Sequence, residues 1–149
     1  MENSDIRVSD TQFRLVDHAA DIGISVSGKS LKSLFLNAAK GLVHVVFQCS
    51  KVPTFQPKNI EVAVSAIDGD QLLVKWLQEI LFLINAKRFI PMGFKILSLT
   101  KRMLKAHVSY VPFDPETHEI RRELKAVTYH GLSIKKSGGQ FRATVIFDI

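Results

Sequence analysis

The sequence predicts an α+β fold: a single domain with a mainly antiparallel β-sheet and two amphipathic helices packed on one face. Two segments, 31–47 and about 70–86, carry apolar residues at helical spacing. Several others alternate apolar and polar residues with a period of two, which is typical of strands. The last two of these flank Ser137-Gly138-Gly139-Gln140, a strong hairpin signal. The predicted order is two strands, a helix, a strand, a helix and five strands.

The first half of the chain mixes strand and helix patterns. Ile22, Ile24 and Val26 alternate with small residues, as in a half-buried strand. Ser30 follows as a candidate N-cap of the first helix. The predicted elements are strands at 13–16 and 22–26, a helix at 31–47, a loop with two prolines at 51–58 and a strand at 60–66.

The second half begins with the most regular helix and continues with strands alone. Asp68-Gly69-Asp70 breaks the preceding strand and can start this helix, which runs to about Ala86. After Pro91 we expect two antiparallel strands, a polar connection, an extended segment and a hairpin. The two strands lie near 93–99 and 103–110, and the polar connection covers 113–122. The extended segment is 124–127, and the hairpin strands are 132–136 and 141–147.

Length and composition indicate one globular domain. The chain has 149 residues, of which 46% are hydrophobic and 23% charged. We expect residues 1–11 to form a flexible N-terminal tail and 12–149 to form the folded domain. The single cysteine, Cys49, excludes an intrachain disulfide and favours a reducing compartment. No signal-peptide pattern is present, and charged residues interrupt the most apolar stretch, so we expect a cytoplasmic protein without a membrane segment.

The motifs of common catalytic sites are missing from the sequence. It has no phosphate-binding loop, no dinucleotide-binding glycine turn, no serine hydrolase elbow and no zinc spacing among its five histidines. This argues against an independent enzyme. The net charge of +6 favours acidic partners. Lys101, Arg102, Arg121 and Arg122 are candidates for contact with RNA or a partner protein, although a solvated surface is the simpler interpretation. We therefore expect RNA contact to be weak or indirect.

The stretch LVDHAADIGI is unusual because it places Asp17, His18 and Asp21 among residues that otherwise predict strand. Acids resist burial unless a positive charge compensates them. A hard cation could do so, and oxygen ligands favour calcium or magnesium over zinc. Alternatively, Asp17 and Asp21 cap a turn, and the spacing alone favours this simpler interpretation.

The end of the chain offers further oxygen ligands. Alternation in the last strand turns Asp148 away from the face that carries Phe147. Ile149 carries the free α-carboxylate, which it can anchor by burying its own side chain. If this end meets the acidic stretch, the negative groups would repel one another and a cation would resolve the conflict. The simpler alternative is that Asp148 is merely exposed.

Five segments, in this order and spacing, together resemble the archease family over nearly the whole chain. DHAAD, KAVTYH and a chain that ends in DI make the match specific, although each alone would be weak. The segments are LVDHAADIGISVSG at 15–28, LKSLFLNAAKGL at 31–42, DGDQLLVKWLQEILFL at 68–83, ELKAVTYHGL at 123–132 and VIFDI at 145–149.

The resemblance implies a non-catalytic accessory protein of the RtcB-type RNA ligase, which joins RNA ends in tRNA splicing and RNA repair. Such a protein promotes guanylylation of the ligase and supports its multiple turnover. The resemblance also implies a divalent metal ion, usually calcium. Its ligands would be Asp21, Asp148 and Ile149, the last through a main-chain or terminal oxygen.

The resemblance suggests lesser roles for three other residues. Asp17 would support the site or cap a turn, and His18 would form a structural hydrogen bond. Lys125 could balance the acidic charge or touch the ligase, although a solvated side chain is the simpler interpretation. The same simpler interpretation holds for Thr128 and His130.

Two departures from the family pattern stand out. The threonine of the DHTAD motif is absent, so Ala20 sits beside Ala19, and Val111-Pro112-Phe113 occupies the region of a common Gly-Glu pair. Two other functions stay open: a general RNA-binding or protein chaperone module, and a small metal-dependent phosphoester hydrolase that uses Asp17, His18 and Asp21.

Overall fold

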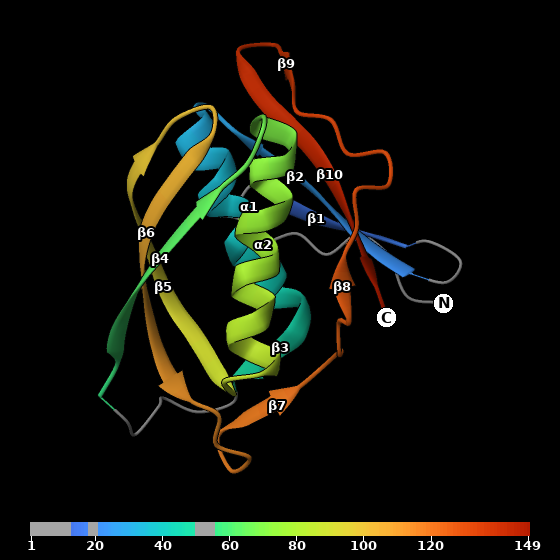
Figure 1. Ribbon diagram of the computed structural model, residues 1–149. Coiled ribbons are helices and arrows are strands. Elements are labelled where there is room, and N and C mark those ends of the chain that lie inside the picture. Colours follow the sequence, from blue (N-terminus) through green and yellow to red (C-terminus); the bar gives the residue numbers. More distant parts are fainter. Residues whose placement is uncertain (1–12, 18–20, 50–55) are drawn as a thin grey trace.

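The computed structural model describes residues 13–17, 21–49 and 56–149. In this part of the chain, two larger antiparallel sheets stand on either side of two helices, α1 (Leu31–Val46) and α2 (Gly69–Asn85) (Figure 1). One sheet has the order β1-β2-β10-β8, with β9 also paired to β10, and the other has the order β4-β6-β5. A small sheet pairs β3 with β7. The strands are β1 (Phe13–Asp17), β2 (Asp21–Gly28), β3 (Phe47–Cys49), β4 (Lys58–Ser65), β5 (Phe89–Leu99), β6 (Met103–Pro112), β7 (His118–Ile120), β8 (Ala126–Val127), β9 (Lys135–Ser137) and β10 (Gln140–Asp148).

Each helix begins at a residue that caps it. Ser30 caps α1, because its Oγ accepts a hydrogen bond from the Ser33 N–H at 3.1 Å and its own N–H donates to Ser33 Oγ at 3.0 Å. Asp68 caps α2 and accepts from the Gln71 N–H at 2.8 Å. These residues confirm both predicted helix starts.

Both helices bury more than a single stripe because each contacts strands of both larger sheets. Trp76 in α2 is fully buried, and its indole N–H donates to the Phe35 carbonyl of α1 at 2.9 Å. The helices therefore form one continuous core with the two sheets. This confirms the α+β class, but the strands are divided between sheets on both sides of the helices and do not form one sheet with both helices on one face (Figure 1).

The β9–β10 hairpin turns at Gly138 and Gly139, as the sequence predicts. Both glycines have positive φ, 62° and 76°, and Ser137 pairs with Gln140. Two central residues with positive φ define the type I′ turn, whose twist matches that of the strands it joins.

Several element boundaries differ from the predicted ones. Helix α1 ends at Val46, because Phe47 begins β3 and pairs with Ile120 inside the predicted polar connection. Strand β5 begins before Pro91. Proline has no backbone N–H to donate, and an edge strand tolerates this because no neighbouring strand on its open side needs that donor. The expected tail, 1–11, lies outside the described residues.

Neither described helix is long and apolar enough to cross a membrane.

Candidate functional site

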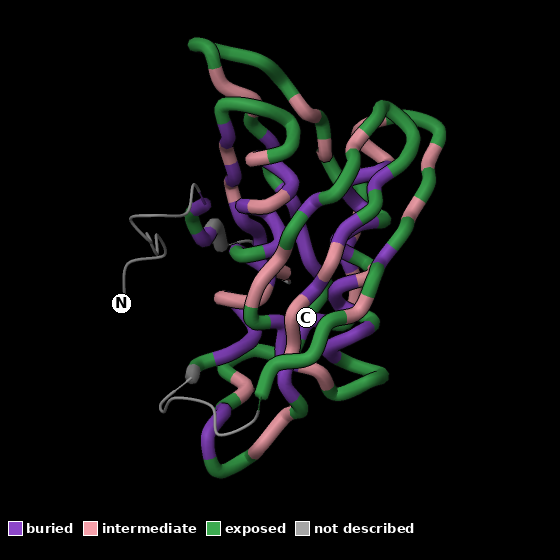
Figure 2. The backbone as a smooth tube through the Cα atoms, turned by 90° about the vertical axis from the view of Figure 1, so that its left-hand side faces the viewer, coloured by how far each residue is buried: buried purple, intermediate pink, exposed green. Residues whose placement is uncertain are grey.

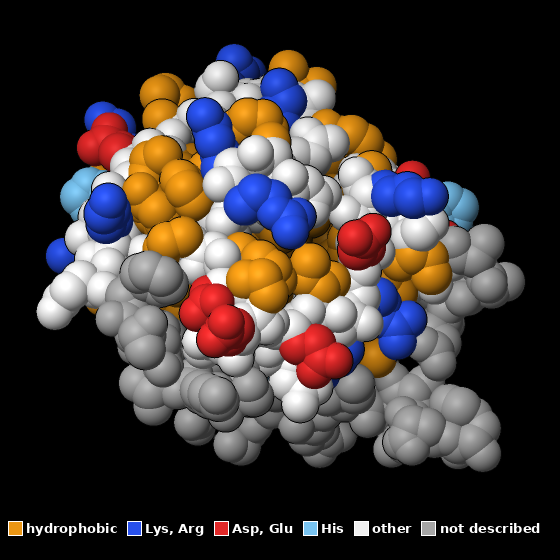
Figure 3. Space-filling view, turned by 90° about the horizontal axis from the view of Figure 1, so that it is seen from below, with side chains coloured by type: hydrophobic (Ala, Val, Ile, Leu, Met, Phe, Trp, Pro, Cys, Tyr) orange, Lys and Arg blue, Asp and Glu red, His pale blue; other side chains and the backbone are white. Residues whose placement is uncertain are grey.

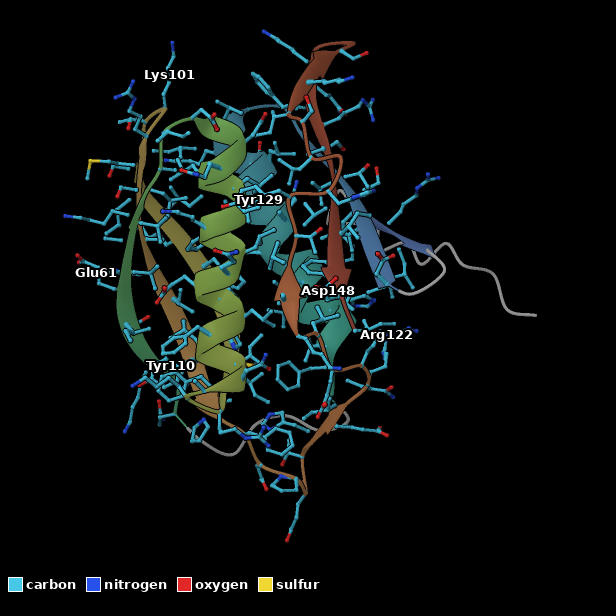
Figure 4. The ribbon with its side chains drawn as sticks, turned by 45° about the vertical axis from the view of Figure 1, so that its right-hand side comes forward. Glu61, Lys101, Tyr110, Arg122, Tyr129 and Asp148 are labelled. Atoms are coloured by element: carbon cyan, nitrogen blue, oxygen red, sulfur yellow. The ribbon has the colours of Figure 1, made fainter. Side chains whose placement is uncertain are left out.

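Two aspartates that are far apart in the sequence meet across the β2–β10 ladder. Asp21 begins β2, Asp148 ends β10, and the antiparallel register pairs them directly. Side chains of directly opposed residues project from the same face of a sheet, with Cβ atoms about 4.5–5.5 Å apart. Asp21 is half-buried and Asp148 is exposed, and Figure 4 shows Asp148 at the end of its strand. The two acidic ends that the sequence singled out are therefore neighbours. We call Asp21 and Asp148 the acidic pair.

Strand β8 holds the end of β10 from the other side. Ala126 pairs with Asp148, and the Lys125 N–H donates to the Asp148 carbonyl at 2.8 Å. One residue beyond β8, the Thr128 N–H and hydroxyl donate to the Ile146 carbonyl at 2.9 and 3.0 Å. The KAVTYH segment is thus an edge element that fixes the acidic pair. Thr128 has a structural role in place of the expected solvated one, whereas the Lys125 side chain is exposed.

Helix α2 sets the position of this edge. The Asn85 side-chain amide, in the last turn of α2, donates to the Leu124 carbonyl at 3.0 Å, and the Leu124 side chain is buried. The chain therefore enters β8 from a point that the core fixes. Lys125 and the end of β10 are positioned by this contact with α2.

The acidic pair offers carboxylate oxygens, the ligand type that a hard divalent cation prefers. Like charges directly opposite one another destabilise a sheet, and a cation between them would reverse that effect. Within the described residues no group of three or more His, Cys, Asp or Glu side chains could hold a metal. The described part of the site thus supplies two carboxylates and main-chain oxygens, which are ligands that suit calcium.

The remaining predicted site residues have mixed outcomes. His18, Ala20 and the Asp17 side chain lie outside the described residues, and the backbone of Asp17 pairs with Ile22. The Ile149 side chain is 43% exposed, so the expectation that it buries itself to anchor the carboxylate is wrong. Since β10 ends at Asp148, no strand pairing draws Ile149 toward the core.

The region that lacks the Gly-Glu pair packs as core away from the acidic pair. Val111 is fully buried in β6, and the Phe113 N–H donates to the Arg88 carbonyl at 2.9 Å. The Phe113 ring lies 6.3 Å from that of Phe47 and 5.1 Å from the Arg88 guanidinium. This stretch therefore supports the β3–β7 end of the molecule.

Two exposed aromatic side chains near β8 were missed by sequence reasoning. Phe82 is 49% exposed on α2, beside a groove of about 300 Å³ between α2 and β8 that Lys125 and Ala126 also line. Tyr129, just beyond β8, is 50% exposed. Aromatic residues often anchor protein interfaces. The sequence did contain a sign that Phe82 is exposed, because this residue lies outside the apolar stripe of the helix.

His130 is exposed just beyond β8, where its backbone N–H donates to Thr128 Oγ1 at 3.2 Å, and the other three described histidines serve other parts of the fold. His118 is buried, and its Nδ1 accepts a hydrogen bond from the Asp114 N–H at 3.0 Å. Burial, and secondarily the nearby Arg121 charge, lowers the pKa of His44 on α1. His107 lies 3.6 Å from Glu61 in the β4-β6-β5 sheet. None of these three is on a strand that carries the acidic pair.

Sequence comparison gives one consistent result. The model of the Archease protein family (MTH1598/TM1083) matches residues 13–149. A protein archease from Methanosarcina acetivorans is 31% identical over 142 residues, covering 93% of this chain and 96% of the relative. A protein archease from Sulfolobus acidocaldarius is 32% identical, covering 93% and 99%.

Solved structures share the fold. The solution structure of Methanobacterium thermoautotrophicum protein 1598 is 30% identical, has a TM-score of 0.71 and matches 92% of this chain and 98% of its own. The crystal structure of a Thermotoga maritima archease, described as a possible chaperone, has a TM-score of 0.62 at 22% identity, with coverages of 90% and 94%. The second likeness concerns the fold alone.

Proposed function

Because the chain belongs to the archease protein family, we propose that it is a non-catalytic accessory protein that activates an RtcB-type RNA ligase. It would promote guanylylation of the ligase and its multiple turnover, in tRNA splicing or RNA repair. The observation that carries this proposal is the register that places Asp21 opposite Asp148, with β8 holding the strand end in place. The acidic pair is the part of the molecule that the partner would contact.

The metal belongs to the same proposal. Asp21 and Asp148 would bind a divalent cation, with calcium as the best chemical match, through their carboxylates, and Ile149 would add a main-chain or terminal oxygen. Calcium takes about six to eight oxygen ligands, so water or a group of the ligase would complete its coordination. When bound, the cation neutralises the repulsion between the two carboxylates and gives the site a positive centre.

The residues of this chain would act by offering a rigid surface. The Asp148 main chain is paired on both sides, to β2 and to β8. A surface that is ordered before binding loses little conformational entropy when the partner arrives. It can favour the guanylylation-competent ligase only if it binds that conformation more tightly than the others. Phe82 and Tyr129 would supply apolar contacts at the margin of the acidic pair.

The test is ligase guanylylation in the presence of Asp148→Ala. We expect the variant to keep its fold, because Asp148 is exposed and its strand hydrogen bonds are main-chain, and to lose stimulation of the ligase. Thr144→Ala is the matched control, since Thr144 is exposed on the same face of the same strand, opposite Ser25. Normal stimulation by Asp148→Ala would contradict the proposal.

A protein chaperone function is the second candidate, since a Thermotoga maritima archease that shares the fold is itself described as a possible chaperone. It predicts that the isolated protein suppresses aggregation of an unfolding client without any ligase, and that Asp148→Ala does so equally well. The metal-dependent hydrolase would instead require phosphoester turnover by the purified protein alone, lost in Asp21→Asn.

A further inference from the structure

Four segments gather at the end of the molecule where both helices begin. Figure 1 shows the starts of α1 and α2, the β5–β6 turn and the β9–β10 hairpin at the top. The same turns are largely exposed in Figure 2. We call this surface the basic end, because its exposed side chains include Lys29, Lys32, Lys101, Arg102, Lys135, Lys136 and Arg142.

Strand pairing and hydrogen bonds join these segments into one surface. Phe141 in the hairpin pairs with Gly28, directly before α1, and Arg142 pairs with both Ser27 and Lys135. The Ile134 N–H donates to the Asp70 carboxylate in the first turn of α2 at 3.0 Å. The Ala66 N–H, before α2, donates to the Arg102 carbonyl at 2.8 Å. Basic residues from distant parts of the sequence are therefore held together.

The charges at the basic end are not neutralised by ion pairs. The ion pairs of Glu61 with Lys105 and His107 lie in the β4-β6-β5 sheet, and no ion pair between described residues involves a basic side chain of the basic end. The acids at this end are Asp68 and Asp70, and both accept backbone hydrogen bonds. The amide groups at the start of each helix add further positive potential. Seven basic side chains against two acidic ones give this end a net positive charge.

The opposite end of the molecule differs. Figure 3 shows that end, where Asp and Glu side chains lie among Lys and Arg. The acidic pair is also remote from the basic end, because it lies at the other end of β2, an eight-residue strand. At about 3.3 Å per residue, the strand separates them by about 23 Å. A ligand of the basic end would therefore bind independently of the acidic pair.

We infer that the basic end is a sequence-independent binding surface for the phosphate backbone of single-stranded RNA. Lysine and arginine side chains spread over several segments can follow a chain of phosphates, and binding gains free energy from released counterions. Ile67 follows Ala66, which donates to the Arg102 carbonyl, and Met103 follows Arg102; the two residues are 72% and 57% exposed and offer apolar contacts for ribose or bases. This inference goes beyond ligase activation and holds whether or not a ligase is the partner.

The experiment is fluorescence anisotropy with a labelled oligouridine at several salt concentrations. We expect a Kd of about 10⁻⁴–10⁻⁶ M near physiological salt, typical of backbone binding. Two double variants, Lys101→Ala/Arg102→Ala and Lys135→Ala/Lys136→Ala, remove equal charge from different elements. Each should weaken binding about tenfold at 0.1 M salt and reduce the salt slope by about 1.4, since each lost phosphate contact contributes about 0.7.

The matched control is Lys58→Ala/Lys95→Ala, which removes the same charge from exposed positions of the β4-β6-β5 sheet. Circular dichroism checks that each protein is folded. Because the two basic-end variants change different elements, each tests the inference by itself. Equal weakening by the control, or binding to phosphatidylserine vesicles without binding to RNA, would overturn the inference.

Ligase activation is measured separately. Asp148→Ala should bind RNA normally, and both basic-end variants should still stimulate guanylylation in the absence of RNA. RNA binding can therefore be measured in a variant that has lost ligase activation, and ligase activation in a variant that has lost RNA binding.

Discussion

The acidic pair and the basic end lie at opposite ends of the β2–β10 ladder and are built in different ways. Strand pairing and main-chain hydrogen bonds fix Asp21 and Asp148 as one specific pair. The basic end collects exposed side chains from turns and helix starts. The first arrangement suits a ligand that needs defined geometry, and the second suits a long polyanion. Single substitutions should therefore affect the two ends differently.

The largest effect is expected from Gly28→Ala, because this residue joins the ladder to α1. An added Cβ would lie 2.5 Å from the Leu34 nitrogen and 2.8 Å from the Ser33 carbonyl carbon. Backbone atoms cannot move aside as a flexible side chain can, so we expect a loss of about 3 kcal/mol in the free energy of unfolding, measured by urea denaturation. Both functions would weaken together.

Gly93→Ala is the control for that change. Its added Cβ would meet Ser109 Cβ at 3.8 Å, an ordinary contact, so its stability should stay close to that of the native chain. A similar loss in both variants would show that the close approach at Gly28 is not the cause.

Calcium should stabilise the folded protein by binding at the acidic pair, and this effect should not depend on the basic end. A ligand that binds only the folded state adds about 2.7 kcal/mol at a hundredfold excess over its Kd. We expect calcium to raise the Tm of the native chain. The rise should disappear in Asp21→Asn and weaken in a chain extended beyond Ile149. It should persist in Lys101→Ala/Arg102→Ala, and its loss there would contradict the separation of the two ends.

Asn85→Ala tests whether α2 positions the acidic pair. Loss of the hydrogen bond to the Leu124 carbonyl should cost about 1 kcal/mol of stability. The edge formed by β8 would loosen, so the calcium-dependent rise in Tm should also shrink. Asn59→Ala, at an exposed position of β4, should change neither value. An undiminished calcium effect in Asn85→Ala would separate the acidic pair from α2.

The smallest expected effect is a gain in RNA binding by Asp70→Asn. The amide can still accept the hydrogen bond from the Ile134 N–H, while one negative charge leaves the basic end. Screened electrostatics at this range predict about twofold tighter binding. Glu119→Gln, exposed on β7, removes a like charge elsewhere and should have less effect. Equal gains would mean that net charge alone determines affinity.

Local patterns predicted the elements better than the contacts between them. The glycines of the β9–β10 turn, the caps Ser30 and Asp68, and the alternation of β2 are local signals, and the structure confirms them. The three-residue strands β3 and β7 are too short to give a pattern, and Phe47 also fitted the helical spacing. Division of the strands into separate sheets was likewise not predictable from alternation.

The two charged surfaces depend on long-range pairing. The sequence identified Asp21 and Asp148 as candidates, but only the register shows that they meet. The contact between Asn85 and Leu124 has no sequence signature. The basic end has no run of charges, because its lysines and arginines are distributed between Lys29 and Arg142 and converge through turns. Pairing between distant segments was therefore the missing information.

The central position of β10 has a consequence for synthesis of the chain. Strand β10 lies between β2 and β8, so the sheet stays incomplete until residues 140–148 are available. Before then β1 and β2 form only a two-stranded hairpin, which is marginally stable by itself, and β2 presents an open edge. Open edges can pair with other chains. During translation, the nascent protein would therefore depend on protection of this edge until β10 emerges from the ribosome.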